Sequence, residues 1–437
     1  MKSFFKSSRS LILDFSKRLC GSSFLGNTTQ LLSGEMVAQA VGFAVLPLLT
    51  RLYGPSAFGV LGVFMAISEV GGKMSSLRYD VAVVLPLKDR EAWALLRFAA
   101  LFGLSFLLFL FIASFPFRGD ISEFFGVDAL EAYFPLLALM MLGICWQSLG
   151  SFWSLRGKHF RAIAQGSAGS SIVGNCLKVT AGLFGFGVGG LLWGSVMQRW
   201  SNLLLIRCLT PSRIWQHETV KGEALRLAIA YNEFPKYRMP QDFLNTLTRQ
   251  IPNILLAACF SPVAAGFYIL AVRILQLPFS LLQEAVRKVF YIKAVEIQRE
   301  ESSLFKLCSL MSLIIFVGML PIVLILVGWG GVLFEFVFGS EWSTTGLYAK
   351  WVILGVLCGF VSVPSAVVVP ILGWNRFYLI FEIVSTVLRF SLMVCVALSL
   401  TANATVAAIA LGSCASSLSL TGIVLIRLRR LESRIQI

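Results

Sequence analysis

Residues 304–327 read LFKLCSLMSLIIFVGMLPIVLILV, an apolar run in which Lys306 is the only charged residue. A helix needs about 20 predominantly apolar residues to cross a bilayer, so this run predicts a membrane-spanning helix. The whole chain has a matching composition, since 57% of its 437 residues are hydrophobic and only 14% are charged. Soluble domains carry about 25% charged residues. We therefore expect an all-α integral membrane protein.

Eleven further segments have a similar length and composition, which gives about 12 expected transmembrane helices. The fifth and seventh segments are the least hydrophobic. Both combine a charge with Gly, Ser, Asn or Thr, as is typical of helices that face other helices or a wet cavity. The twelve segments are 25–49, 57–77, 94–115, 132–153, 163–183, 187–207, 241–260, 262–285, 304–327, 347–371, 376–397 and 402–426.

The basic residues of the connecting segments indicate the orientation of these spans. Of the 37 Lys and Arg residues, 29 fall in the two tails or in the loops that follow even-numbered spans, whereas the other loops hold only Arg51 and Arg118. The positive-inside rule then predicts that both termini are cytoplasmic, which requires an even number of spans. Most of the net charge of +15 therefore reports topology. No sequence pattern indicates nucleic acid as a partner, and the cysteine and histidine spacings indicate no metal site.

Six basic and three acidic residues remain inside or at the edge of the expected spans. A charge at the centre of a lipid-exposed helix costs roughly 2.5 to 3.5 kcal/mol, so we expect these side chains to line an aqueous cavity or to pair across helices. Because the bases outnumber the acids six to three, not every base can be paired with an acid, and some cationic charge is left in the interior. The residues are Lys178, Arg199, Arg249, Arg273, Lys350, Arg389, Glu35, Glu69 and Glu382.

The positions of these residues favour different roles. Arg249 and Arg273 lie near mid-depth in neighbouring spans, where they are suited to an anionic substrate. Glu35 lies in the polar run GNTTQLLSGEMVAQ and is a candidate for a protonatable coupling site. Glu382 and Arg389 share one face of a span, and a purely structural pairing with other spans is an open alternative.

An internal repeat divides the chain into two six-span halves. PSAFGVL at 55–61 and PVAAGFY at 262–268 follow the first helix of each half and share the pattern P-x-A-x-G. The pattern predicts that Pro opens the next helix and that Gly permits close backbone approach. An even number of spans in each half predicts parallel repeats with a cavity between two lobes. The expected divisions are a tail at 1–24, a lobe at 25–207, a linker at 208–240, a lobe at 241–427 and a tail at 428–437. The first tail is expected in the cytoplasm, either as a simple tail or as an interfacial helix.

The stretch LLTRLYGPSAFGVLGVFMAISEVGGKMSSLRYDVAVVLP at 48–86 resembles the Wzx-type O-antigen and polysaccharide repeat-unit flippases. These belong to the multidrug/oligosaccharidyl-lipid/polysaccharide exporter superfamily. The segments at 266–291 and 338–357 are similar to the second half of the same family. The resemblance implies a MATE-like fold with two six-helix lobes around a central cavity. It also implies a multi-pass transporter of the bacterial plasma (inner) membrane, not an enzyme.

The implied activity is movement of undecaprenyl-diphosphate-linked oligosaccharide from the cytoplasmic to the periplasmic leaflet, for lipopolysaccharide O-antigen, capsule or exopolysaccharide. Surplus Arg would bind the diphosphate by charge-assisted hydrogen bonds. Arg51 in TRLYGP and Arg273 in AVRILQLP are similar to family positions, although Arg51 is equally explained as an external cap or topology residue. The substrate-binding candidates are Arg51, Lys178, Arg199, Arg249, Arg273 and Arg389, and the ion-coupling candidates are Glu35, Glu69 and Glu382.

The expected mechanism is alternating access without a cofactor. No GxxxxGK[ST] motif occurs, which argues against P-loop ATP hydrolysis and favours an antiporter driven by a proton or sodium gradient. Membrane lipids, a polysaccharide polymerase and a chain-length regulator are the implied partners. Two alternatives stay open. A multidrug exporter would carry cationic cargo, which a basic cavity disfavours, and a membrane polymerase or ligase would need larger external loops than the 16-residue stretch FRGDISEFFGVDALEA.

Overall fold

The computed structural model describes residues 22–211, 223–299 and 303–435. Within these ranges the chain forms helices and turns, with no β-strand. The expected N-terminal tail lies almost wholly outside the described residues. The structure divides into two compact units. Unit 1 comprises residues 1–49, 67–118 and 132–246, and unit 2 comprises residues 50–66, 119–131 and 247–437.

Each of the twelve predicted segments coincides with a long helix, and the segment at 347–371 forms a pair of helices. They are α2 (Ser22–Leu52), α3 (Pro55–Ser75), α5 (Asp89–Ser114), α8 (Phe134–Arg156), α9 (Phe160–Leu183), α10 (Gly187–Leu209), α12 (Met239–Cys259), α13 (Pro262–Arg299), α14 (Leu304–Phe338), α15 (Ser343–Val361) with α16 (Val363–Ile371), α17 (Asn375–Ser399) and α18 (Ala402–Ile435).

Short helices complete the described part of the chain. They are α4 (Tyr79–Ala82), η1 (Phe115–Phe117), α6 (Arg118–Phe124), α7 (Ala129–Ala132), α11 (Glu223–Ala230), the π-helix η3 (Phe234–Arg238) and η4 (Ser340–Trp342).

Nine candidate membrane spans are present among the described residues. The helices that do not qualify are α9, α10 and α12, although they are 24, 23 and 21 residues long. Two of them carry the fifth and seventh segments, whose polar residues lower the hydropathy below that of a lipid-facing helix. The chain is therefore an all-helical multi-pass membrane protein. The crossing of α9, α10 and α12, the two-lobe arrangement and the lobe boundaries stay predictions.

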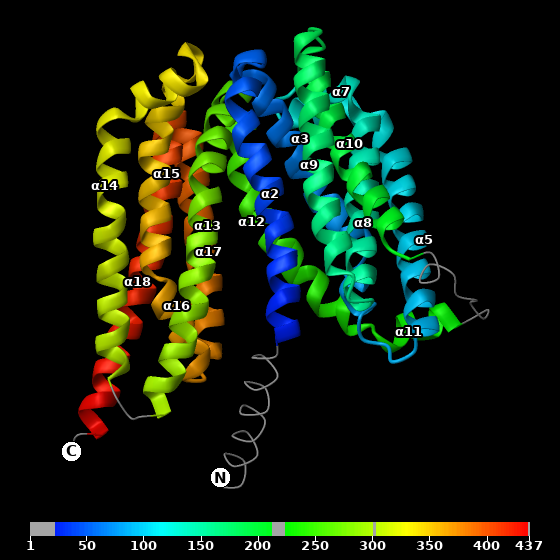
Figure 1. The fold of residues 1–437 in the computed structure, drawn as a ribbon. Coiled ribbons are helices and arrows are strands. Elements are labelled where there is room, and N and C mark those ends of the chain that lie inside the picture. Colours follow the sequence, from blue (N-terminus) through cyan, green and yellow to red (C-terminus); the bar gives the residue numbers. More distant parts are fainter. Residues whose placement is uncertain (1–21, 212–222, 300–302, 436–437) are drawn as a thin grey trace. The chain divides into compact units, whose positions relative to one another are not determined.

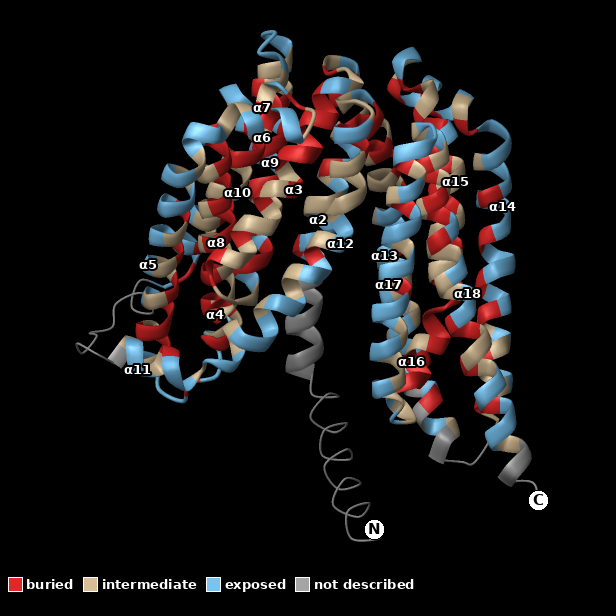
Figure 2. Cartoon of the chain, turned by 180° about the vertical axis from the view of Figure 1, so that it is seen from behind, coloured by how far each residue is buried: buried red, intermediate tan, exposed pale blue. Residues whose placement is uncertain are grey.

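Inside each unit the helices pack in bundles (Figure 1). In unit 1, α10 packs against α8 and α9, while α5 packs against α8 and α11. In unit 2, α15 packs against α13, α14 and α18, and α17 packs along α18. Figure 2 colours much of α5 and α14 pale blue, as exposed residues. Phe109 on α5 and Phe336 on α14 are 70% and 81% exposed, and such apolar outer faces are suited to hydrocarbon.

The repeated P-x-A-x-G motif forms a reciprocal contact inside unit 2. As predicted, α3 begins at Pro55 and α13 begins at Pro262. A Cβ atom on Gly59 would overlap the carbonyl oxygen of Pro262, and a Cβ atom on Gly266 would overlap that of Pro55. The prediction that these glycines permit close backbone approach is therefore confirmed. The backbone that each glycine approaches belongs to the other copy of the motif, so the two copies pack against each other.

Trp342 stabilises the same region of unit 2. Its indole Nε1 donates to the carbonyl oxygen of Thr50 at 3.0 Å, and its ring packs edge-on against Phe58 with centroids 5.2 Å apart. The side chain is almost completely buried. A buried Trp with a satisfied N–H combines a large apolar contact with a directional bond, so it fixes the end of α2 and the first turn of α3 against η4.

Candidate functional site

Unit 1 contains an ionic network that joins α3, α8 and α10. The Glu69 Oε1 atom lies 2.7 Å from Nη2 of Arg199, and Glu69 Oε2 lies 3.0 Å from Nζ of Lys73. The Nη1 atom of Arg199 donates to Oε1 of Gln147 at 2.9 Å. Two of the predicted site residues, Glu69 and Arg199, therefore meet across helices. The single carboxylate of Glu69 serves two cations.

Lys178 is held in a separate polar contact of unit 1. Its side chain is 6% exposed, and its Nζ atom donates to Oε1 of Gln198 on α10 at 3.0 Å. A Cβ atom on Gly194 would overlap the Lys178 stem, so this glycine makes room for the lysine between α9 and α10. A buried ammonium needs polar partners, and the structure supplies them from the neighbouring helix.

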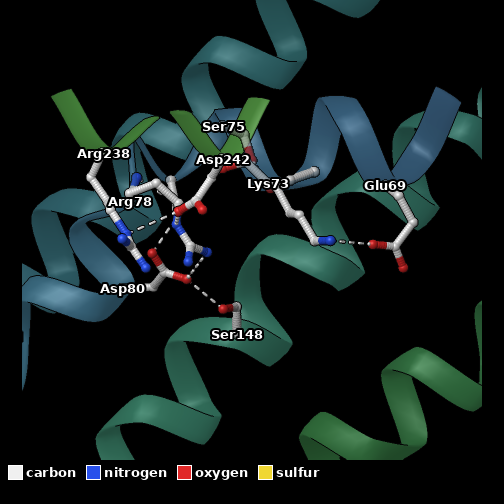
Figure 3. Close-up of polar contacts among 10 residues, drawn as sticks. Glu69, Lys73, Ser75, Arg78, Asp80, Ser148, Arg238 and Asp242 are labelled. Atoms are coloured by element: carbon white, nitrogen blue, oxygen red, sulfur yellow. Dashed lines mark hydrogen bonds and ion pairs between the residues drawn. The ribbon is translucent and has the colours of Figure 1, made fainter. Parts of the chain in front are cut away.

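A second ionic cluster lies at the end of α3 and was not predicted (Figure 3). Asp80 is 1% exposed. Its carboxylate accepts from the Ser148 hydroxyl at 2.5 Å and from the Ser76 hydroxyl at 3.4 Å, and its Oδ2 atom lies 3.3 Å from Nη1 of Arg78. A buried carboxylate is tolerated when such bonds and a cation replace its hydration. Sequence reasoning missed this cluster because Arg78 and Asp80 follow the expected span at 57–77, where Arg78 counts as a topology charge of the connecting segment.

The cluster continues into the start of α12. Asp242 Oδ2 lies 2.8 Å from Nε of Arg78 and 3.3 Å from Nε of Arg238. Arg78 and the preceding Leu77 have φ values of 61° and 48°. Left-handed backbone at residues other than Gly costs about 1–3 kcal/mol each and persists only where surrounding contacts hold it. The two carboxylates hold Arg78 in this conformation.

Tyr79 and Arg156 fix the neighbouring segments of unit 1. The Tyr79 hydroxyl donates to the carbonyl oxygen of Ala228 on α11 at 2.9 Å, and burial raises the pKa of Tyr79. Arg156 donates to the carbonyl oxygen of Pro86 at 2.6 Å and pairs with Asp89 at 2.9 Å. The segment that follows the span of α3 is thus tied to α8 and to α11. The last of these lies in the predicted linker.

The basic candidates of unit 2 lie in a different environment. Arg273 is half-buried on α13, while Arg249 on α12 and Arg51 in the last turn of α2 are exposed. Lys350 is half-buried on α15. Among the described residues, no acid lies within ion-pair distance of Arg249 or Arg273. The charges of these two cations are therefore not neutralised by an acid in the described part of the chain.

Glu382 and Arg389 pair with each other. Nη2 of Arg389 lies 3.3 Å from Glu382 Oε1, and the guanidinium also donates to the Thr386 hydroxyl and the Ser385 carbonyl, both at 3.2 Å. All four residues belong to α17, so the alternative of pairing with other spans is wrong for this pair. Arg389 borders a cavity of about 240 Å³. The third acidic candidate, Glu35, is exposed on α2 and has no ion pair within the described ranges.

Comparisons with known proteins place this fold. A family model described as polysaccharide biosynthesis protein matches residues 48–346. The structure is similar to lipid II flippase MurJ in an inward closed conformation, with a TM-score of 0.67 and 12% identity over 91% of this chain and 86% of that one. A mutant of the Vibrio cholerae MATE transporter VcmN gives a TM-score of 0.55 and 13% identity over 93% and 96% of the two chains. An inward-facing multidrug resistance MATE family transporter of the MOP superfamily gives a TM-score of 0.55 and 15% identity, over 93% of this chain and 95% of that one. No curated protein matches the sequence.

These comparisons establish two facts. The solved structures share less than a sixth of their residues with this chain, so they show the fold alone, and that fold is MATE-like as predicted. The family model covers well over half of the chain. The stretch at 48–86, which carries the resemblance and the first P-x-A-x-G motif, falls within the matched residues. The chain belongs to the polysaccharide biosynthesis protein family.

Proposed function

We propose that the protein is a flippase. Its cargo is an undecaprenyl-diphosphate-linked oligosaccharide repeat unit, moved from the cytoplasmic to the periplasmic leaflet of the bacterial inner membrane for O-antigen, capsule or exopolysaccharide synthesis. Membership of a polysaccharide biosynthesis family supports the pathway. A fold similar to that of a lipid II flippase supports transport of a lipid-linked substrate. In this proposal the protein supplies binding and movement, with no covalent chemistry.

The observation that carries the proposal is the surplus of basic side chains in unit 2. Arg249 and Arg273 lack acidic partners in the described part of the chain. A guanidinium stays protonated in proteins and matches phosphate oxygens with parallel N–H donors. A diphosphate would supply the negative charge that the protein does not. Cationic drugs would be repelled by the same side chains, which disfavours the multidrug exporter.

We infer that Glu69 is the best of the three coupling candidates. Its carboxylate holds both Arg199 and Lys73, so protonation or sodium binding would free two cations at once. Glu382 holds one cation within its own helix, and Glu35 holds none among the described residues. Alternating access driven by a proton or sodium gradient would then change the pairing of Arg199 during the cycle.

Reconstitution tests the proposed function. Cells that lack the gene should accumulate the lipid-linked oligosaccharide on the cytoplasmic face, and the extracted lipid should be flipped by the purified protein in proteoliposomes. Empty liposomes are the control. Accumulation of unpolymerised units on the outer face would instead support a polymerase or ligase. Dissipation of the proton and sodium gradients should slow flipping, and an unchanged rate would remove the coupling proposal while leaving the flippase intact.

A further inference from the structure

A partly open cavity of about 310 Å³ is lined by residues of unit 2 alone, from α13, α15 and α18. The α13 wall carries polar residues although it belongs to a candidate membrane span, Pro262–Tyr291. Gln276, Ser280 and Gln283 contribute side chains to it, and Ser413 on α18 contributes a hydroxyl. We call it the α13 cavity. None of its polar residues is charged, which separates it from the sites described above.

Four polar residues of α13 share one face of the helix. At 3.6 residues per turn, Arg273, Gln276, Ser280 and Gln283 fall within an arc of about 80° around the helix. Arg273 lies at the start of this face, about 4.5 Å along the helix axis from Gln276 at 1.5 Å per residue. This face thus presents a cation, then two amides and a hydroxyl, and one turn beyond Gln283 it reaches the exposed Arg287.

Within the described ranges, the two glutamines of the α13 cavity have no hydrogen-bond partner in the protein. Among the described residues, neither Gln276 nor Gln283 has a side-chain hydrogen bond. An unsatisfied amide at membrane depth costs several kcal/mol unless it faces protein, water or a ligand. The opposite wall explains why the space stays open, because Gly355 and Gly359 on α15 face it without side chains. A Cβ atom on Gly359 would meet nothing within 4 Å.

We propose that the α13 cavity binds neutral sugar residues of the lipid-linked oligosaccharide, an inference that rests on the proposed flippase function. Each amide offers two donors and an acceptor, and each sugar hydroxyl both donates and accepts. Tyr268 and Phe279 supply apolar wall for the C–H faces of a sugar ring. The order along α13 matches the order of groups in the cargo, since the diphosphate is joined directly to the first sugar. Arg273 takes the charge, and Gln276 and Gln283 take the hydroxyls beyond it.

A binding experiment with two lipids tests this assignment. The probes are undecaprenyl diphosphate without sugar and the lipid-linked oligosaccharide extracted from cells that lack the gene, each titrated against the purified protein in nanodiscs. The wild type should bind the glycolipid about tenfold more tightly, as expected for a few added hydrogen bonds. The double variant Gln276→Leu/Gln283→Leu should lose this preference and bind undecaprenyl diphosphate with unchanged affinity. Arg273→Gln should weaken the binding of both lipids.

Two further variants separate sugar binding from structural effects. Gly359→Leu fills the cavity without changing a polar group and should also abolish the preference. Gln165→Leu, at an exposed position on α9, should preserve it. Retention of the preference in both cavity variants, or equal weakening for the two lipids, would overturn the assignment. If the deletion strain accumulates no lipid-linked oligosaccharide, or if the wild type does not bind that lipid, the proposed flippase function itself fails.

Discussion

The two units treat their interior charges in opposite ways. In unit 1, the acids Glu69 and Asp80 each contact at least one cation, and Asp80 is almost completely buried. In unit 2, Arg249 and Arg273 have no acidic partner among the described residues. Of the six basic residues that the sequence places in spans, two lie in unit 1 and four in unit 2. We infer that the paired charges of unit 1 stabilise structure, with Glu69 in addition proposed to couple transport, and that the unpaired cations of unit 2 contact cargo.

The physical cost of each arrangement supports this distinction. A buried ion pair adds little net stability compared with apolar packing, but removal of one partner is costly because the other charge stays buried. A cation without a partner destabilises the free protein and is retained where a ligand supplies the missing charge. Variants in unit 1 should therefore lose stability, whereas variants in unit 2 should lose binding and transport.

The largest effect is expected for Asp80→Ala. This change removes the acceptor of the Ser148 hydroxyl and one of the two acids that contact Arg78. We expect the free energy of unfolding to fall by about 3–5 kcal/mol, as for a broken buried pair, which thermal unfolding in detergent would measure. Asp89→Ala is the matched control, because Asp89 is exposed and Arg156 keeps its carbonyl acceptors. A loss of stability no greater than that of the control would contradict a structural role for Asp80.

The next effect is expected for Arg249→Gln/Arg273→Gln in unit 2. Loss of a charge-assisted hydrogen bond costs about 1.5–3 kcal/mol, so each change should slow flipping by about tenfold and the pair by about a hundredfold. Thermal stability should stay constant or rise, because an unpaired cation has been removed. Arg287→Gln is the control on α13, the helix that carries Arg273. The Arg287 guanidinium is exposed, and its contact with Glu284 is long, at 3.9 Å. Normal flipping by the double variant would remove the phosphate-binding role.

Sequence patterns predicted the helices better than the site. Apolar length located every long helix, and the P-x-A-x-G repeat predicted both the first residue of α3 and α13 and the need for Gly59 and Gly266. The repeat did not reveal that its two copies contact each other, because one chain segment carries no information about the segment packed against it. Charge counting found Glu69 and Arg199 because a charged residue inside an apolar run is costly to insert into a membrane and is therefore conspicuous in the sequence.

Two features of the site escaped the same reasoning. Asp80 follows an expected span, where an acid next to basic residues is indistinguishable from an ordinary loop charge. Gln276 and Gln283 lie in an expected span but are uncharged, so a count of ionisable residues passed over them. A useful signal was available, namely that both glutamines share one face of α13 with Arg273. Neutral polar residues in membrane helices therefore need the same scrutiny as charged ones.

A double-mutant cycle on Glu69 and Arg199 should give a smaller effect. Glu69→Gln leaves Arg199 and Lys73 without their carboxylate, while Arg199→Gln leaves Glu69 paired with Lys73. We expect a coupling energy of about 1–2 kcal/mol, within the range of contacting residues, and partial rescue of Glu69→Gln by the second change. Thermal unfolding of the four proteins measures it. Additive losses would show that the 2.7 Å contact contributes nothing specific.

The smallest effect is expected for Glu382→Gln, which removes the acid of the Glu382–Arg389 pair in unit 2. Glu382 is 50% exposed, and the contact of 3.3 Å lies within α17. Screening reduces such a pair to at most about 0.5 kcal/mol, and Arg389 keeps its bonds to Thr386 and Ser385. Thermal unfolding should therefore differ little from the wild type. A loss as large as that of Asp80→Ala would mean that unit 2 also depends on its interior ion pairs, and the distinction between the two units would no longer hold.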